Sequence, residues 1–244
     1  MAFIIIICLV ILSVFAMVFY HRGNRYEVIG GFTKCSSPLV VFDFDGTLCD
    51  SFKFVLEGLE LVAQRNGLAP LTESEKEELK GMTSTELMKR FNIRWYHMPG
   101  LVKEMREQIS LRISEMKAFE GVGPMLSTLK EKGASIGILT TNSAENAQNF
   151  LALHGLDSHF DFIYGGGSMF GKSKHLSKIL RKTDLNPKTD TALYVGDETR
   201  DIVAALESGF NPVSVSWGFN SVENLEKAQG KKVITDWSEL YSYL

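Results

Sequence analysis

The sequence contains few cysteines and no large excess of charge of either sign. Each of these features argues against a class of protein. The 244 residues include three cysteines, Cys8, Cys35 and Cys49. Their odd number and unpaired spacing argue against a disulfide framework and a structural zinc site. The 26 Lys and Arg residues nearly balance the 29 Asp and Glu residues, giving a formal net charge of -3. Because binding of nucleic acid needs a basic surface, we expect no nucleic-acid partner.

Charge is also missing from the start of the chain. Residues 2–20 are uncharged and almost entirely apolar, and about 20 such residues are needed to cross a bilayer as a helix. No Lys or Arg precedes this run, whereas Arg22, Arg25 and Lys34 follow it. We therefore predict an uncleaved transmembrane helix and a single-pass membrane protein whose remaining chain lies on the cytoplasmic side. A cleaved signal peptide is the alternative, which the lack of a basic n-region disfavours.

An acidic motif follows a predicted linker at 21–37. The apolar run 39–42 predicts a buried strand that ends at Asp43. Side chains on extended backbone alternate, so Asp43 and Asp45 are expected to point the same way and to share a divalent cation. Gly46 then permits a sharp turn, and the Thr47 hydroxyl can tie that turn together.

Residues 51–117 have a helical pattern. Thr72 with Glu75, and Thr83 with Glu86, have the spacing of capping boxes that open helices. The block carries no recognisable chemistry, and its place directly after the acidic motif predicts an all-helical cap domain inserted over the site. The core domain is then expected to comprise 38–50 and 118–244.

Strands and helices alternate beyond the helical block. Apolar strands are predicted near 135–139, 162–164, 192–195 and 213–215, each separated from the next by a helical segment. This alternation predicts an α/β fold with a Rossmann-like doubly wound parallel sheet. Ligands bind such sheets at the carboxyl ends of the strands, so catalytic side chains are expected directly after strands.

Polar residues do follow these strands. Thr141 and Asn142 come after one strand and before a helix, where free amides and a hydroxyl can hold a phosphate, although both residues are also ordinary helix caps. Asp197 comes directly after another strand, and Asp201 lies four residues further along. If Asp201 lies in the first turn of the next helix, it can face the same cation as Asp197.

Residues 166–173 offer a different interpretation. They fit the P-loop pattern of glycine, four residues and Gly-Lys-Ser, placed after a strand and before a helix. A nucleotide-binding protein with Asp197 on magnesium is therefore an alternative. A P-loop usually opens its domain, however, and this interpretation leaves Asp43, Asp45 and Thr141 without a function.

Together the strand ends resemble the haloacid dehalogenase superfamily in its phosphatase branch. The helical block lies where phosphoglycolate-phosphatase-like members carry a cap. The resemblance covers about residues 39–215 and rests on four motifs in order, namely residues 43–48, Thr141, Lys172 and residues 196–201. Many relatives follow the motif lysine with proline, whereas this chain has Ser173, so Lys174 is an alternative to Lys172.

The resemblance implies a Mg²⁺-dependent phosphatase acting on a small phosphorylated metabolite, phosphoglycolate-like or a sugar phosphate. Asp43 would be the nucleophile that forms an aspartyl-phosphate, and Asp45 the acid and base. Thr141, Asn142 and Lys172 would bind the phosphoryl group. The metal ligands would be Asp43, Asp45 through its carbonyl, Asp197 and Asp201. A phosphomutase and a catalytically idle, membrane-tethered interaction protein remain the other possibilities.

Overall fold

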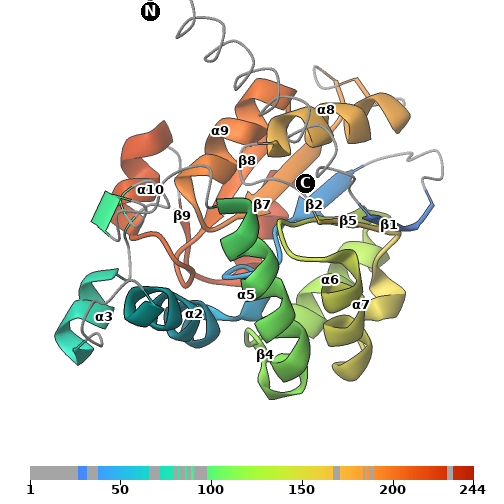
Figure 1. Ribbon diagram of the computed structural model, residues 1–244. Coiled ribbons are helices and arrows are strands. Elements are labelled where there is room, and N and C mark those ends of the chain that lie inside the picture. The colour runs from blue at the N-terminus through green and yellow to red at the C-terminus, as the bar shows by residue number, and fades with distance from the viewer. Residues whose placement is uncertain are drawn as a thin grey trace, which may run out of the picture.

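The computed structural model describes residues 27–31, 38–65, 72–79, 82, 86, 89–90, 98–166, 171–183, 185–186, 189–229 and 233–244. Its centre is a seven-stranded sheet in the order β1-β6-β5-β2-β7-β8-β9 (Figure 1). All neighbouring strands are parallel except β1 and β6. The strands are β1 (Glu27–Gly30), β2 (Leu39–Phe42), β5 (Ser135–Leu139), β6 (Phe162–Gly165), β7 (Ala192–Gly196), β8 (Asn211–Val215) and β9 (Val233–Ile234).

Helices cover both faces of the sheet because alternate residues of β2 point to opposite sides. Val40 and Phe42 belong to a core shared with α6 (Val122–Glu131) and α7 (Ala144–Leu153). Leu39 and Val41 belong to a second core with α8 (Lys172–Lys182) and α9 (Thr199–Ser208). Figure 1 shows α8 and α9 above the sheet and α6 and α7 below it. The predicted α/β fold with a mainly parallel sheet is therefore confirmed.

The C-terminal part of the chain completes one end of the sheet. Beyond β8, α10 (Val222–Gln229) leads to β9, which lies parallel to β8. The final 3-10 segment η4 (Trp237–Tyr243) packs on the core, where the Trp237 ring meets Phe42 at 6.1 Å between centroids. The last predicted strand ends at 215, so β9 is an addition that only the structure shows.

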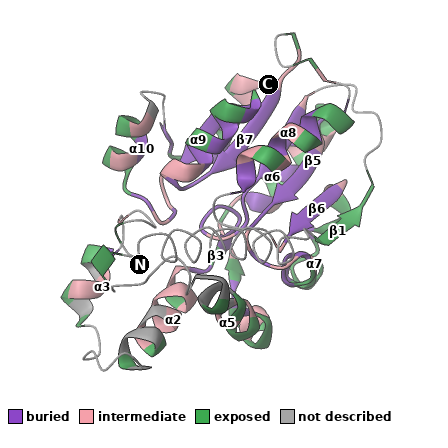
Figure 2. Cartoon of the chain, turned by 45° about the horizontal axis from the view of Figure 1, so that its top comes forward, coloured by how far each residue is buried: buried purple, intermediate pink, exposed green. Residues whose placement is uncertain are grey.

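A short ribbon joins the core to the block between residues 51 and 117, which we call the insert. β3 (Cys49–Asp50) pairs antiparallel with β4 (Lys117–Ala118), so the chain leaves and returns at neighbouring points. The helices in the described part of the insert are α2 (Phe52–Arg65), α3 (Glu73–Leu79), α5 (Met98–Arg112) and the 3-10 turn η2 (Ile113–Glu115). Figure 2 shows α2, α3 and α5 grouped together, apart from the buried strands.

One of the two predicted capping boxes is present in the insert. The backbone N–H of Glu75 donates to Thr72 Oγ1 at 3.3 Å, and the Thr72 N–H donates to Glu75 Oε2 at 2.9 Å. These reciprocal bonds satisfy amides that the first helical turn leaves open, so α3 begins where the sequence predicts. The second box depends on residue 83, which lies outside the described residues.

The predicted linker at 21–37 contains a strand. Residues Glu27–Gly30 form β1, with Glu27 opposite Gly165 and Gly30 opposite Phe162 at the edge of the sheet. All four residues of β1 are exposed. Antiparallel edge pairing uses backbone groups and needs no buried side chain, so the apolar pattern of the sequence does not mark this strand.

The structure contradicts the predicted location in a membrane. Within the described part of the chain, no helix combines the length and the apolar character that crossing a membrane requires. The longest of these helices, α5, has 15 residues and carries charged side chains, whereas a spanning helix needs about 20 apolar residues. The predicted segment, residues 2–20, lies outside the described residues. We therefore do not retain the single-pass topology with a cytoplasmic catalytic domain.

Candidate active site

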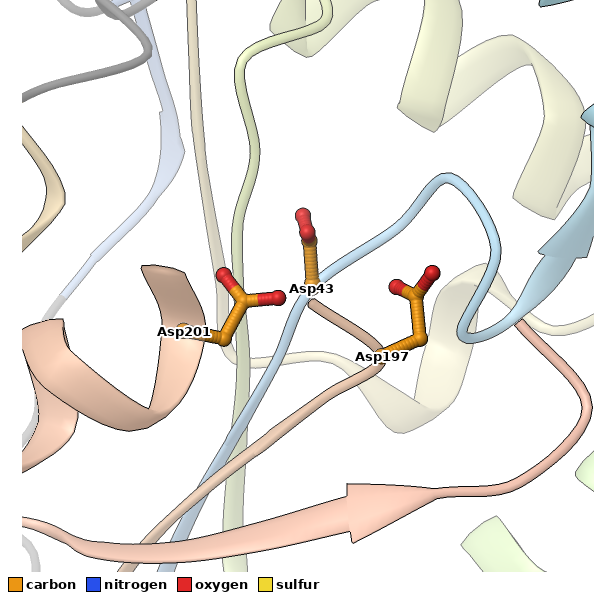
Figure 3. Close-up of side chains that lie close together, drawn as sticks. All are labelled: Asp43, Asp197 and Asp201. Carbon is orange, nitrogen blue, oxygen red and sulfur yellow. The ribbon is translucent and has the colours of Figure 1, made fainter. Parts of the chain in front are cut away.

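Three aspartates meet at the carboxyl end of the central strands. Asp43 follows β2, Asp197 follows β7, and Asp201 lies in the first turn of α9. Each residue offers a carboxylate oxygen, and these oxygens all lie within 4.8 Å of one another. Figure 3 shows the three side chains side by side, with Asp43 and Asp197 on loops and Asp201 on a helix. Neighbouring parallel strands end at one edge, which brings together residues more than 150 positions apart.

Asp43 is held tightly from three directions. Its backbone N–H donates to the Val195 carbonyl at 2.8 Å, which continues the pairing of β2 with β7. Its Oδ1 accepts the Phe44 N–H at 2.8 Å, and its Oδ2 accepts Lys172 Nζ at 2.5 Å. Burial raises the pKa of Asp43 to about 7, with Lys172 acting against the rise and Asp201 adding to it. The carboxylate is thus fixed in orientation and needs further positive charge to stay ionised.

Lys172 supplies the cation between two of the aspartates. As the first residue of α8 it is 2% exposed, and its Nζ donates to Asp43 Oδ2 and, at 2.7 Å, to Asp201 Oδ1. Burial acts to lower the pKa of Lys172, but the Asp201 and Asp43 charges outweigh it and the pKa is raised. Lys172 therefore remains an ammonium. The side chain of Lys174 is exposed on the same helix, so the geometry favours Lys172 as the motif lysine.

Among the described residues, neutral donors alone bond the Asp197 carboxylate. The Thr47 hydroxyl donates to its Oδ1 at 2.8 Å, and the Phe219 N–H donates to its Oδ2 at 2.7 Å. Burial raises the pKa of Asp197 well above its usual range, and the nearby charges of Glu198, Asp201 and Asp43 add to the rise. This carboxylate therefore lacks a cationic partner among the described side chains.

Asp201 is positioned by a capping box at the start of α9. The Glu198 N–H donates to Asp201 Oδ2 at 3.1 Å, while Lys172 occupies Oδ1. This places Asp201 at the third position of the helix, in its first turn. Glu198 in turn pairs with Arg200, an ion pair beside the aspartates that the sequence motifs did not predict.

The residues present fit a small divalent cation. The three buried carboxylates are accompanied by one buried ammonium, which pairs with Asp43 and Asp201, so the cluster carries an excess of negative charge. Two glycines keep the space beside Asp197 open, because a Cβ on either Gly46 or Gly218 would collide with that side chain. Gly46 also has φ 75°, which other residues rarely adopt. Hard oxygen donors around such a space are the ligands that Mg²⁺ prefers, so these residues could hold a metal ion.

The Asp45 carboxylate lies outside the aspartate cluster. Its Oδ2 accepts Asn142 Nδ2 at 3.1 Å, and the metal-binding cluster found among the described residues does not include it. Burial raises the pKa of Asp45, which Ser51 and Asn142 act to lower. Asp45 forms an isolated bridge with Cys49 just before the turn at 46–48. A role for its side chain on the ion shared with Asp43 stays a prediction.

Thr141 lies in the turn between β5 and α7. The Thr140 hydroxyl accepts the Asn142 N–H at 2.9 Å and so holds the turn, while Thr141 is half-buried. The Thr141 carbonyl accepts two N–H groups of Arg106 from α5, with Nε at 2.7 Å. The insert thus contacts the loop that carries the predicted phosphate-binding residues. The role of Thr141 in binding phosphate stays a prediction.

The loop after β8 contributes to the site, although the sequence motifs end at β7. Besides the Phe219 N–H, this loop places Trp217 Nε1 3.2 Å from the Thr47 carbonyl, as a donor. Asn220 accepts the Thr199 N–H at 2.9 Å and donates to the Met82 carbonyl of the insert at 3.0 Å. Because this loop follows a parallel strand, its place in the sequence could have marked it as part of the site.

Of the P-loop stretch at 166–173, residues 167–170 lie outside the described residues. The lysine of the pattern, Lys172, is bonded to Asp43 and Asp201. Lys172 thus lies in the aspartate cluster, where the resemblance to the haloacid dehalogenase superfamily places it.

The sequence is similar to known proteins over most of its length. The sequence model of the haloacid dehalogenase-like hydrolase family matches residues 40–215. A phosphoglycolate phosphatase from Synechococcus elongatus is 32% identical over 189 residues, which are 78% of this chain and 88% of that protein. The tyrosine-protein kinase PtkA of Mycobacterium tuberculosis is 26% identical over 203 residues, covering 80% of this chain and 69% of that protein.

The fold is shared with solved structures. A haloacid dehalogenase-like hydrolase from Streptococcus pneumoniae superposes with a TM-score of 0.69 at 22% identity, over 85% of this chain and 98% of that one. The match of the family model spans the strands that carry Asp43, Thr141 and Asp197. The chain therefore belongs to the haloacid dehalogenase-like hydrolase family.

Proposed function

We propose that the protein is a Mg²⁺-dependent phosphatase that hydrolyses a small phosphomonoester through an aspartyl-phosphate at Asp43. The observation that carries the proposal is the buried contact of Asp43 with Lys172 at the end of the central strand. A carboxylate held by one ammonium and flanked by Asp197 and Asp201 suits attack on an anionic group.

In the first step, an oxygen of Asp43 attacks phosphorus, and the bond between phosphorus and the leaving oxygen breaks. The Phe44 N–H and Lys172 fix the carboxylate in a single orientation, which lowers the entropic cost of reaching the transition state. The positive charge of Lys172 also reduces repulsion between the nucleophile and the substrate. Thr141, Asn142 and Lys172 are the groups we assign to the phosphoryl oxygens.

Asp45 has the chemical properties of the acid and base. It lies two residues from the nucleophile and accepts a hydrogen bond from Asn142, and burial raises its pKa, which favours a carboxyl that can carry a proton. In our proposal it protonates the leaving oxygen. It then takes a proton from the water that cleaves the bond between Asp43 and phosphorus.

Asp43, Asp197 and the backbone carbonyl of Asp45 would hold the metal ion, with Asp201 helping directly or through water or Lys172. When bound, Mg²⁺ supplies positive charge that offsets repulsion between the carboxylate and the phosphoryl group. The raised pKa values of Asp43 and Asp197 support this assignment, because both carboxylates lack sufficient compensating charge in the metal-free protein.

A small substrate is supported by the relative at 32% identity, which is a phosphoglycolate phosphatase. The insert touches the loops after β5 and β8 through Arg106 and Asn220, on two sides of the aspartates. The insert therefore contacts the core close to the aspartate cluster. We therefore propose phosphoglycolate or a similar small phosphorylated metabolite as the substrate class.

The test is release of inorganic phosphate from phosphoglycolate, a panel of sugar phosphates and acetyl phosphate, with and without Mg²⁺. We expect release that requires Mg²⁺ and that Asp43→Asn abolishes. Asp157→Asn, an exposed carboxylate in the turn after α7, is the matched control and should keep wild-type activity. If Asp43→Asn keeps its activity, the covalent mechanism is wrong.

A further inference from the structure

A chain of side-chain amides links the insert to Asp45. Asn146 in α7 is 3% exposed, and its Nδ2 donates to the backbone carbonyl of Arg106 at 3.0 Å and to Asn142 Oδ1 at 2.9 Å. Asn142, 2% exposed, donates in turn from its own Nδ2 to Asp45 Oδ2. An amide nitrogen has two hydrogens, so both N–H groups of Asn146 are used.

These bonds fix which way the Asn142 amide faces. Its Oδ1 accepts both the Ser143 N–H at 2.9 Å and Asn146 Nδ2. With the oxygen held by two donors, the NH₂ group is left to face Asp45, and an NH₂ group can only donate. Without Asn146, one of the two donors that resist a flip of the Asn142 amide is lost.

The Asn142 amide nitrogen lies at different distances from the two carboxylate oxygens of Asp45. Asn142 Nδ2 lies 3.1 Å from Oδ2 but 3.5 Å from Oδ1. The Asn142 donor therefore lies closer to Oδ2 than to Oδ1 and gives the two oxygens of the carboxyl different surroundings. A carboxyl that acts as an acid must present its proton to the leaving oxygen in one direction, so this unevenness bears on the reaction.

We propose that Asn146 is a positioning residue for the reaction. Acting through Asn142, it fixes the orientation of the Asp45 carboxyl, and its second N–H couples that orientation to helix α5 of the insert. The inference rests on the proposed function, in which Asp45 protonates the leaving oxygen.

The alternative explanation is that Asn146 only holds the insert on the core, as a structural clamp. The contacts of Arg106 allow this clamp to be separated from the positioning of Asp45. Asn146 bonds the backbone carbonyl of Arg106, whereas the Arg106 guanidinium bonds the Thr141 carbonyl. Arg106→Ala therefore removes one contact between insert and core but keeps the carbonyl that Asn146 uses. Any effect of Arg106→Ala measures the clamp, and any additional effect of an Asn146 variant measures the positioning of Asp45.

The distinguishing measurement compares two leaving groups. An alkyl phosphomonoester such as phosphoglycolate leaves as an alkoxide and needs protonation. Acetyl phosphate is of similar size and leaves as acetate, which needs none. Loss of a positioned acid lowers kcat/KM for the first substrate far more than for the second, because general acid catalysis contributes about 100-fold or more only where the proton is needed. A loosened clamp lowers both alike.

The variants are Asn146→Ala and Asn146→Asp. The second has nearly the shape of asparagine, but its carboxylate repels Asn142 Oδ1 and the Arg106 carbonyl and favours the flipped Asn142 amide. Asn149→Ala, exposed on the same helix, is the control. Thermal unfolding with Mg²⁺ identifies variants that fold, and Asn146→Asp keeps the test valid if Asn146→Ala does not.

We expect kcat/KM for the best alkyl phosphomonoester of the panel to fall by about tenfold or more in both Asn146 variants. For acetyl phosphate we expect a fall below about threefold, and for Arg106→Ala an equal change with both substrates. Equal losses with both substrates in the Asn146 variants, or no loss, overturn the inference and leave the proposed function standing. A wild-type protein that cleaves neither substrate overturns both.

Discussion

Lys172 Nζ lies 2.5 Å from Asp43 Oδ2 and 2.7 Å from Asp201 Oδ1, with all three side chains almost fully buried. One ammonium is thus shared by two carboxylates, one at the end of β2 and the other in the first turn of α9. Asp197, the third carboxylate, has only neutral donors within the part of the chain that the structure describes. The pair of Lys172 and Asp43 therefore holds the site together, and the site as a whole remains short of positive charge.

Removing Lys172 should damage both activity and stability. Lys172→Met leaves Asp43 and Asp201 buried without a cation, and breaking such a buried pair costs roughly 3–5 kcal/mol. We expect phosphate release to be lost and the urea midpoint to fall. Lys174→Met changes an exposed lysine on the same helix and should behave like the wild type. Loss of activity in Lys174→Met instead would make Lys174 the motif lysine.

Metal binding should stabilise the protein more at high pH than at low pH. The pKa of Asp43 is raised to about 7 in the folded, metal-free protein, from 3.8. Between these values the folded state binds more protons than the unfolded state, so the metal-free protein loses stability as the pH rises toward 7. A cation that binds the ionised carboxylates removes this loss.

The measurement is the melting temperature in EDTA and in Mg²⁺ at pH 5, 6, 7 and 8. We expect the increase caused by Mg²⁺ to grow across this series. In Asp43→Asn the dependence on pH should be weaker, because one titrating ligand is gone. An increase of the same size at every pH would show that Asp43 does not titrate in this range.

The space at Gly218 should be essential for activity. A Cβ at this position would overlap Asp197, so Gly218→Ala must displace either the carboxylate or the loop after β8. We expect at least a roughly tenfold loss of kcat/KM and a higher requirement for Mg²⁺, since a small misplacement at an active site is costly. Gly100→Ala is the control, because a Cβ there meets nothing within 4 Å. Unchanged Mg²⁺ dependence in Gly218→Ala would contradict the assignment of Asp197 to the metal.

Asn220 should stabilise the contact between the core and the insert. Its side chain is 2% exposed and bonds the Thr199 N–H and the Met82 carbonyl. Asn220→Ala leaves the first of these backbone groups unsatisfied, which costs about 1–3 kcal/mol. Urea unfolding measures this loss, and the exposed Asn149→Ala should show almost none. A stability equal to that of the wild type would mean that water replaces both bonds.

Local patterns in the sequence predict most of the elements and the residues at their ends. The run from 39 to 42 predicts a buried strand, and the structure buries all four residues. Asp43 follows this strand, Asp197 follows β7, and Asp201 lies in the first turn of α9, as their spacing predicts. These features depend on neighbours within about one helical turn or on alternation along a strand, so the pattern of the sequence contains them.

Which of these side chains meet depends on the tertiary structure. It directs the Asp45 carboxylate to Asn142 instead of the other aspartates, brings the loop after β8 to Asp197, and ties Asn146 to the insert. The order of strands in the sheet and the packing of the insert set these contacts. The partners in these contacts lie between 22 and 97 positions apart in the sequence. No local periodicity encodes such pairings.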